Sequence, residues 1–308
     1  MSVADSSLAA ALAPPLRRAL DQQPRRGSRV VNGAKISWLE WGDPARRTLV
    51  FIHGGAAHAW WWAFTAPVLA DRYHVVAMDL SGHGDSDRRS VYDFHTWAEE
   101  ALGVAFAFGT EEPPIVLGHS MGGIVASVVA GHPRAVDLGG VIVIDSPVVM
   151  PSPKVREADE GALGVVRYYP DRASAIGNFR LRPRQAVAAS DLLRFVAERS
   201  VQEDPAGRGW TWRYDPRIFQ TPAANRPAST LPNLTSAPCG IGVVVGEKSV
   251  VVPDSDRALL ARAAESGRLA VQVIEGGAHH LMFDKPWELM VAITDLIAHC
   301  LHVPRRSG

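Results

Sequence analysis

Short runs of apolar, largely β-branched residues recur along the chain, and this pattern constrains the fold more than any other feature. Residues 35–41 alternate between apolar and polar side chains, as a half-buried strand does. The other runs are nearly uninterrupted and rich in Val and Ile, which is typical of strands buried on both faces of a parallel sheet. They lie at residues 48–52, 74–78, 115–117, 141–144, 241–245 and 269–274.

Segments long enough to form helices separate many of these runs. Because strands and helices alternate along the chain, the sequence predicts an α/β fold with a mostly parallel central sheet flanked by helices. The expected helices lie at residues 60–71, 94–108, 121–132, 256–265 and 286–301.

One long stretch, residues 148–238, breaks the alternation. It contains no buried-strand pattern, proline-rich segments border it on both sides, and helical patches such as 186–200 lie within it. We therefore expect a helical insertion between two strands of the core. The expected division is an N-terminal extension at 1–28, a core at 29–147 and 239–308, and the insertion at 148–238.

The composition excludes several classes of protein. Of the 308 residues, 32 are Lys or Arg and 32 are Asp or Glu, so the formal net charge is zero with histidine neutral. Such a chain lacks the excess positive charge that would favour binding to nucleic acids or acidic membranes. Its two cysteines, Cys239 and Cys300, are too few for a disulfide framework. No signal peptide is visible in the sequence and no apolar run approaches the length of about 18 residues that spans a membrane, so we expect a cytoplasmic protein.

The candidate nucleophile lies where an expected strand meets an expected helix. Residues 118–122 read Gly-His-Ser-Met-Gly, which places Ser120 between two glycines. A serine on a sharp strand-to-helix turn takes a strained backbone conformation, and only small flanking residues let the neighbouring chain pass. The turn also points the free N–H groups of the helix N-terminus at a developing oxyanion. A glycine-rich helix start with an N-cap serine would share the bare pattern, but the preceding strand favours the nucleophile.

Two adjacent histidines, His279 and His280, follow the last expected strand and precede the last expected helix. The carboxyl ends of parallel strands lie at one edge of a sheet, so this loop can bring a general base to Ser120. His119 lies at the same edge, but it adjoins Ser120 in the sequence and its side chain should project elsewhere. The residues alone leave both His279 and His280 as candidates.

A pair of glycines, Gly54 and Gly55, follows the apolar run at 48–52. Glycines at this position let the backbone approach a substrate closely and present an N–H group to an oxyanion. A tight turn that requires a positive φ would have the same sequence, so the segment by itself supports both interpretations.

Together these segments resemble the α/β-hydrolase superfamily, particularly its single-domain serine hydrolases with a helical cap. The resemblance covers roughly residues 30–148 and 238–301, with the motifs in the family's order. The matching segments are His53-Gly54-Gly55, residues 78–86, residues 118–122, and Gly277-Ala278-His279 followed by Asp284-Lys285-Pro286.

The resemblance implies a role for each matched residue. Ser120 would be the nucleophile and His279 the base, because its spacing to the following Asp-Lys-Pro segment is common in the family; His280 would be a packed neighbour. The oxyanion donors would be the backbone N–H groups of Met121 and Gly55. The insertion would be the cap. Relatives of this kind need no metal or organic cofactor, and none is expected here, since the sequence shows no metal-ligand spacing.

The acid, meaning the carboxylate that orients the histidine base in this family, departs from the family pattern. Its usual position follows the strand after the cap, where this chain has Ser249. We favour Asp145, at the end of the strand after the nucleophile helix, because some family members take their acid from that strand end. A carboxylate there would hold the imidazole in one tautomer. An Asx-turn before Pro147 would also explain this residue. The alternatives are Asp254, Glu247, Asp256, or a relay without an acid.

Aromatic residues indicate the character of the substrate pocket. Trp60, Trp61 and Trp62 follow the glycine pair, and three adjacent tryptophans on one helix cannot all face the same way. At least one should pack on the sheet, and Trp60 and Trp61 are our candidates for the pocket. Further aromatic residues in the insertion favour an apolar substrate, or else form a small core of the insertion itself.

The expected function is that of a cofactor-free serine hydrolase. It would cleave an ester, lactone or activated carbonyl of a small, apolar substrate through an acyl-enzyme. The unusual position of the acid adds two alternatives, a hydrolase of carbon–carbon bonds and a cofactor-independent ring-cleaving dioxygenase. A ligand-binding sensor with little turnover is a third, since a fold alone does not decide function. We expect a small-molecule substrate as partner, with neither nucleic acid nor membrane; the oligomeric state stays open.

Overall fold

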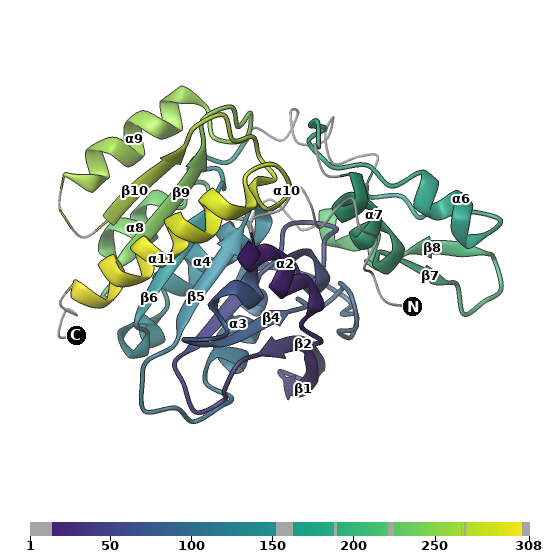
Figure 1. Cartoon of the computed structure of the whole chain (residues 1–308), viewed down its shortest axis with the longest axis horizontal. Coiled ribbons are helices and arrows are strands. Elements are labelled where there is room, and N and C mark those ends of the chain that lie inside the picture. The colour runs from purple at the N-terminus through teal and green to yellow at the C-terminus, as the bar shows by residue number, and fades with distance from the viewer. Residues whose placement is uncertain are drawn as a thin grey trace.

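The central feature of the computed structural model is a sheet of eight strands in the order β1-β2-β4-β3-β5-β6-β9-β10 (Figure 1). Strand β2 runs antiparallel to both of its neighbours, whereas all pairs from β4 to β10 are parallel. The α/β fold with a mostly parallel sheet is therefore confirmed. The structure describes residues 14–151, 163–187, 190–220, 225–265, 267 and 269–303.

The strands lie close to the apolar runs of the sequence. Five of them, β3, β4, β5, β6 and β9, are buried along their whole length, which explains why their residues do not alternate. The bounds are β2 Ala34–Trp41, β3 Thr48–Ile52, β4 His74–Met78, β5 Ile115–His119, β6 Gly140–Ile144, β9 Ile241–Gly246 and β10 Leu269–Ile274.

The first strand, β1 (Arg25–Val31), has no counterpart among the expected elements. None of its residues is buried, so it lacks the apolar pattern by which the other strands are recognised. It pairs with β2 at the edge of the sheet and begins inside the segment expected to be an N-terminal extension. Within that segment, helix α2 (Pro14–Asp21) starts at a proline, which the first turn of a helix tolerates. Residues 1–13 of the extension lie outside the described residues.

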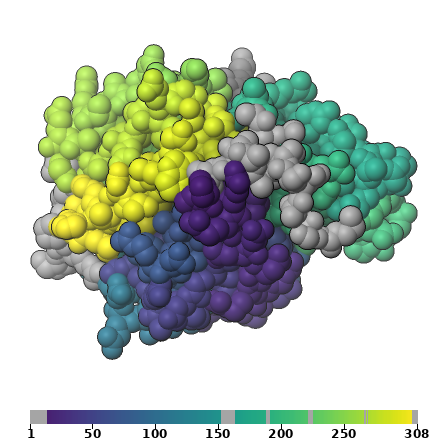
Figure 2. All heavy atoms as spheres, viewed as in Figure 1, coloured from purple at the N-terminus to yellow at the C-terminus, as the bar shows by residue number. Residues whose placement is uncertain are grey.

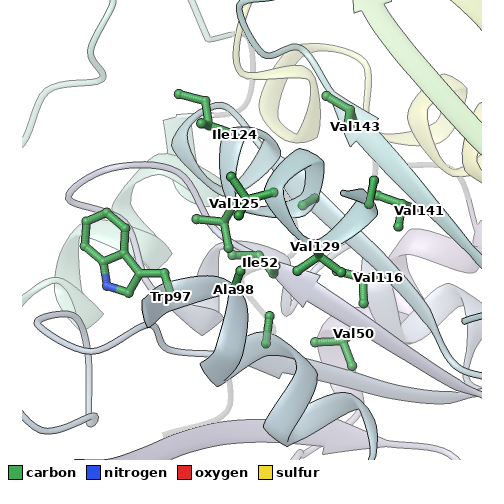
Figure 3. Packing of buried hydrophobic residues seen from close by; sticks show 14 of the residues in the cluster. Val50, Ile52, Trp97, Ala98, Val116, Ile124, Val125, Val129, Val141 and Val143 are labelled. Atoms are coloured by element: carbon green, nitrogen blue, oxygen red, sulfur yellow. The ribbon is translucent and has the colours of Figure 1, made fainter. Parts of the chain in front are cut away.

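Helices cover both faces of the sheet. One face packs against α3 (Phe94–Ala105), α4 (Met121–Ala130) and α9 (Asp254–Ala264), and the other against α11 (Pro286–His302) and the short α10 (Leu281–Asp284). Figure 3 shows the contact of the first face with α3 and α4. The residues labelled there are Val50, Ile52, Trp97, Ala98, Val116, Ile124, Val125, Val129, Val141 and Val143.

The helix expected at residues 60–71 is wrong. The segment instead forms two short 3₁₀ helices, η1 (Ala59–Trp62) and η2 (Ala66–Leu69). Pro67 supplies the reason, because a proline inside a helix lacks the N–H group that would bond to the preceding turn. The break at Thr65 lets the second helix start with that proline in its first turn.

The insertion between β6 and β9 is not purely helical. Its described elements are α6 (Arg172–Gly177), α7 (Ser190–Arg199), the antiparallel pair β7 (Val201–Glu203) and β8 (Trp210–Trp212), η4 (Pro216–Gln220) and α8 (Leu231–Ser236). Elements α6, α7, β7 and β8 project to one side of the sheet, as the ribbon and the space-filling view both show (Figures 1 and 2). In contrast, α8 packs against α4 and α9 of the core.

Backbone hydrogen bonds attach the insertion to loops of the core that lie beyond the ends of the core strands. The Gly84 N–H donates to the Arg213 carbonyl at 2.8 Å, and the Asp215 N–H donates to the Gly82 carbonyl at 2.7 Å. The Tyr92 hydroxyl adds a bond to the Asp215 carboxylate at 2.9 Å. The part of the insertion that follows β8 is therefore fixed to the loop after β4. Among the described residues, the helices are too short or too polar to cross a bilayer.

Candidate active site

Ser120 lies on the sharp turn between β5 and α4, with φ 55° and ψ −120°. The structure shows why glycines flank it. A Cβ at Gly118 would overlap the Gly122 carbonyl, and a Cβ at Gly122 would overlap the carbonyl of His53. The Ser120 N–H donates to the Ile144 carbonyl at 3.0 Å, which ties the turn to β6. The strained conformation is thus held by close backbone packing on both sides.

We expect Gly118→Ala to lower the free energy of unfolding by about 2–4 kcal/mol, because a backbone carbonyl cannot move aside as a side chain can. Urea denaturation followed by circular dichroism measures this loss. Gly177→Ala is the matched control, since a Cβ at Gly177 meets no atom within 4 Å. Equal denaturation midpoints for the two variants would contradict the steric explanation.

Ser120, His279 and Asp145 form a continuous chain of hydrogen bonds. His279 Nε2 lies 3.0 Å from Ser120 Oγ, and His279 Nδ1 lies 2.6 Å from Asp145 Oδ2. Each residue follows the carboxyl end of a parallel strand, namely β5, β10 and β6. The structure therefore brings together the three side chains that the sequence singled out. With Nδ1–H donating to the carboxylate, Nε2 is free to accept the serine proton.

Two further donors hold the Asp145 carboxylate. The Gly246 N–H donates to Oδ1 at 2.8 Å, and the Ser249 hydroxyl donates to Oδ2 at 2.5 Å. Asp145 has φ 44°, a left-handed conformation that aspartate tolerates better than most residues. Ser249, which stands where the family usually has its acid, thus contacts the carboxylate of the candidate acid directly. The sequence analysis missed this contact, although the substitution at that position was its signal.

The other carboxylates considered for the acid lie elsewhere, and none of them contacts His279. Asp254 is fully exposed at the start of α9, 3.7 Å from Arg257. Glu247 accepts a hydrogen bond from the Gly276 N–H at 2.7 Å. Asp256 is buried and accepts the Val148 N–H at 2.7 Å, so it fixes the start of the insertion.

Gly55 lies against Met121, the residue that follows Ser120. A Cβ at Gly55 would lie 3.5 Å from Met121 Sδ and 3.3 Å from the Phe219 ring of η4. Neither the Met121 N–H nor the Gly55 N–H donates to an acceptor within the described part of the chain. An anionic oxygen placed between them would satisfy both donors, at the N-terminus of α4.

His53 fixes the loop that carries Gly55. Its Nδ1–H donates to the Gly54 carbonyl at 2.7 Å, and its Nε2 accepts the Leu80 N–H at 3.1 Å. The bond from Leu80 requires a neutral imidazole, because a protonated ring has no lone pair on Nε2 to accept it. Burial lowers the pKa of His53 to about 4.

This lowered pKa predicts a loss of stability in acid. The unfolded chain takes up a proton at His53 near pH 6.5, whereas the folded chain does so near pH 4. Neutral His53 therefore makes its full contribution to the free energy of unfolding above pH 6.5. About 2–3 kcal/mol of that free energy is lost as the pH falls toward 4. Burial raises the pKa of Asp79 to about 6, which has the opposite effect in the same range.

The informative quantity is therefore the difference in unfolding free energy between the wild-type protein and His53→Gln, measured at pH 7.5 and pH 4.5. We expect this difference to shrink in acid. Because Asp79 is present in both proteins, its titration cancels to first order. A difference that stays constant with pH would refute the effect.

The three tryptophans face different ways. Trp62 is fully buried against β3, as expected of at least one of them. The Trp61 ring lies 5.6 Å from the ring of His280, one residue from the hydrogen-bonded chain. Trp60 lies 6.1 Å from Phe195 of α7, at the contact between the core and the insertion. Of the two pocket candidates, Trp61 is thus the one close to the site, while Trp60 lies at the contact with the insertion.

Two more histidines surround His279. The ring centroids of His119 and His280 each lie 4.7 Å from that of His279, and all three rings are buried. His119 forms no bond to Ser120 but bonds through Nε2 to the His279 carbonyl at 3.0 Å. Burial, followed by the proximity of His279, lowers the pKa of both neighbours well below the ordinary value, so they are neutral near pH 7. The sequence analysis did not foresee this cluster.

Comparison with known proteins agrees with this geometry. The model of the Alpha/beta hydrolase family matches residues 49–293, which is most of the chain. The chain belongs to the α/β-hydrolase family. Among solved structures, this α/β hydrolase resembles the Thioesterase Domain From Curacin Biosynthetic Pathway with a TM-score of 0.71 at 24% identity, covering 89% of this chain and 100% of that one. The E-2-(Acetamidomethylene)succinate Hydrolase gives a TM-score of 0.71 at 23% identity, with the same coverage. At these identities the likeness shows the fold.

Curated relatives match this α/β hydrolase over shorter stretches. Epoxide hydrolase A of Mycobacterium tuberculosis is 33% identical over 98 residues, which is 30% of this chain and 30% of that protein. Protein phosphatase methylesterase 1 of Bos taurus is 39% identical over 103 residues, or 32% of this chain and 27% of that protein. The Uncharacterized hydrolase YugF of Bacillus subtilis is 30% identical over 98 residues, which is 31% of this chain and 36% of that protein. The chain thus spans about a third of the length of the curated relatives it matches.

Proposed function

We propose that this protein is a serine hydrolase that cleaves an ester, lactone or activated carbonyl of a small, apolar molecule through an acyl-enzyme. The observation that carries the proposal is the unbroken chain of hydrogen bonds from the Ser120 hydroxyl through His279 to Asp145. A serine hydroxyl is a weak nucleophile until an adjacent base takes its proton, and this arrangement supplies both the base and its orienting acid.

The reaction begins when Ser120 Oγ bonds to the substrate carbonyl carbon while its proton passes to His279 Nε2. Asp145 keeps Nδ1–H in place and stabilises the imidazolium that forms. The imidazolium then gives its proton to the leaving group, which departs and leaves the acyl group on Ser120. A water molecule releases the acyl group by the same two proton transfers.

The developing oxyanion is stabilised by two backbone donors. The donors are the N–H groups of Met121, which directly follows Ser120, and of Gly55, which lies against Met121; neither has an acceptor among the described residues. These donors are already oriented, so they need no rearrangement as the negative charge develops. By analogy with other serine hydrolases, each donor lowers the activation barrier by about 3 kcal/mol. Nucleophile, base, acid and oxyanion donors are thus all protein groups, and the mechanism requires no cofactor.

The insertion, residues 148–238, serves as the cap. Phe219 of the insertion faces Gly55 across the site, and the Phe179 ring lies 6.2 Å from that of Trp61. These rings favour an apolar acyl or leaving group of limited size. The relatives named methylesterase, and Polyneuridine aldehyde esterase of Rauvolfia serpentina, which is 34% identical over 82 residues, support an ester as the substrate class.

Labelling with a fluorophosphonate tests the proposal. The reagent should add to one residue of the folded protein, which intact mass and peptide mapping would place on Ser120, and prior unfolding should prevent the reaction. Ser127→Ala is the matched control, because that buried hydroxyl bonds within α4 to the Ile124 carbonyl at 2.7 Å. It should label like the wild-type protein. No adduct on Ser120 would refute the proposal.

The position of the acid, after β6, favours one alternative reaction. In a cofactor-independent ring-cleaving dioxygenase, His279 would deprotonate an organic substrate that then reacts with O₂, while Ser120 would only hold the substrate by a hydrogen bond. Turnover that consumes oxygen and survives Ser120→Ala would establish this reaction in place of hydrolysis. Turnover that is equal under nitrogen and air would exclude it, but would leave carbon–carbon bond hydrolysis for a substrate screen to decide.

We expect Ser249→Ala to lower kcat by about 10–100-fold with little change in KM. The Asp145 carboxylate would lose one of its three donors, a bond to a charged group that contributes about 1.5–3 kcal/mol. Ser249→Thr keeps the hydroxyl and should retain most of the activity. Equal kcat values for the two variants would show that the hydroxyl has no positioning role.

A further inference from the structure

His119, His279 and His280 form a compact cluster of imidazoles. All three side chains are buried, and one ring nitrogen from each lies within 4.8 Å of the other two. His119 ends strand β5, while the other two lie in the loop after β10, so the cluster joins two segments that are far apart in the sequence. Serine hydrolysis uses only His279, which leaves the other two rings without a role.

The hydrogen bonds of two rings fix which nitrogens carry lone pairs. His279 Nδ1 donates to Asp145, which leaves the lone pair on Nε2. His119 Nε2 lies 3.0 Å from the His279 carbonyl, which can only accept, so the lone pair of His119 is on Nδ1. That Nδ1 is buried and has no hydrogen-bond partner within the described ranges. Histidines that bind metals usually donate their second N–H to a carboxylate or a backbone carbonyl, as both rings do here.

His280 completes the cluster. Neither of its ring nitrogens makes a well-formed hydrogen bond to the described residues, although the carbonyls of Arg182 and Pro183 lie beside the ring. One nitrogen can therefore donate to such a carbonyl while the other faces the cluster. Buried nitrogens whose lone pairs have no partner cost free energy, and a bound cation would satisfy the lone pairs of His119 and His280.

The cluster lies next to Ser120 and Gly54. A Cβ at Gly54 would come within 3.2 Å of His119 Nδ1 and 3.3 Å of Ser120 Cβ, so the absence of a side chain there keeps the His119 lone pair from being crowded. In a tetrahedral site with metal–nitrogen bonds of about 2.0–2.1 Å, the nitrogens lie about 3.4 Å apart. The nitrogens of the cluster lie up to 4.8 Å apart, so side-chain rotations must bring them closer together by up to about 1.4 Å. The main change is that the His279 lone pair turns from the serine hydroxyl to the ion.

We propose that His119, His279 and His280 form a binding site for a borderline-soft divalent ion, Zn²⁺ in particular, and that occupation of this site inhibits the enzyme. Three neutral imidazoles with an open fourth position suit tetrahedral Zn²⁺, and Asp145 supplies compensating negative charge through His279. The ion occupies the lone pair that must accept the Ser120 proton, so metal binding and hydrolysis exclude each other. The inhibition rests on the proposed hydrolase function, whereas the binding does not.

Binding is tested on the full-length protein, first freed of metal with a chelator. We expect one equivalent of Zn²⁺ by calorimetry, and intense visible absorption of tetrahedral geometry when Co²⁺ is the probe. His280→Gln and His119→Gln should each weaken Zn²⁺ binding at least about tenfold. His95→Gln, which changes an exposed histidine, should not. Equal affinity in all four proteins, or an octahedral Co²⁺ spectrum, would overturn the site.

Inhibition is tested by the rate of fluorophosphonate labelling with and without Zn²⁺. Each protein is compared with its own metal-free rate, so any effect of a variant on that rate cancels. Zn²⁺ should slow labelling of the wild-type protein and of His95→Gln, and a chelator should restore it, while His280→Gln resists. Circular dichroism checks the fold, and His119→Gln provides the same test should His280→Gln not fold. Failure of the metal-free protein to label would refute the hydrolase function but not the metal site. Labelling unaffected by saturating Zn²⁺ would overturn the inhibition.

Discussion

Ser120→Ala should lower kcat for an activated ester by about 10⁵–10⁶-fold, because no other group at the site can form the acyl-enzyme. The oxyanion donors and the pocket remain, so a small residual rate above that in water is expected. The variant should fold normally, since Ala has the same backbone freedom as Ser at φ 55° and the hydrogen bond of Ser120 Oγ among the described residues is to His279. A loss of activity without a loss of stability would therefore be chemical in origin.

Pre-steady-state kinetics with a chromogenic ester provides the measurement. The wild-type protein should show a burst of one equivalent when release of the acyl group is slow, and Ser120→Ala should show none. Ser127→Ala, purified in parallel, controls for contaminating esterases and should keep the wild-type rate. Activity of Ser120→Ala within about tenfold of the wild-type value would contradict the acyl-enzyme mechanism.

Asp145→Asn should lower kcat by about 10⁴-fold. The amide has the shape of the carboxylate, but the donors around it dictate its orientation. The Gly246 N–H requires an oxygen at Oδ1, which turns the amide NH₂ toward His279 Nδ1. The imidazole must then accept at Nδ1 and carry its proton on Nε2, where it cannot take the proton of Ser120. We therefore expect the variant to lose activity because its imidazole carries the proton on the wrong nitrogen.

Asp254→Asn is the matched control for this variant, because Asp254 is exposed at the start of α9 and contacts only Arg257 among the described residues. We expect its kcat to equal that of the wild-type protein. An intact kcat in Asp145→Asn together with a large loss in Asp254→Asn would reverse the assignment of the acid. Nuclear magnetic resonance of the His279 ring nitrogens would show the change of tautomer directly.

The sequence revealed the elements whose signals are local. Strands buried on both faces must be apolar throughout, so the runs at β3, β4 and β6 could be read directly. The exposed strand β1 gives no such signal, and the three-residue strands β7 and β8 are too short to show a period. The segment 60–71 has the length of a helix, but Pro67 inside it divides it into two short 3₁₀ helices.

The three hydrogen-bonded side chains could be located because each follows a recognisable strand, and parallel strands end at one edge of a sheet. Contacts between those loops could not be predicted in the same way. The bond from Ser249 to Asp145 depends on the parallel register of β6 with β9, in which Ile144 lies opposite Val244. The direction of the His119 ring depends likewise on how β5 ends against the loop after β10.

Asp145 and Ser249 extend from neighbouring strands and meet at a single point beneath the imidazole. A negative charge could therefore arrive there from either strand, provided that the other strand offers a small hydroxyl to receive it. If Asp145 were replaced by Ser and Ser249 by Asp, the negative charge would move from one loop to the other while the histidine kept its position. Related enzymes could therefore exchange the two positions of the acid through a pair of substitutions. Sequence patterns that require an aspartate after the penultimate strand would miss chains such as this one.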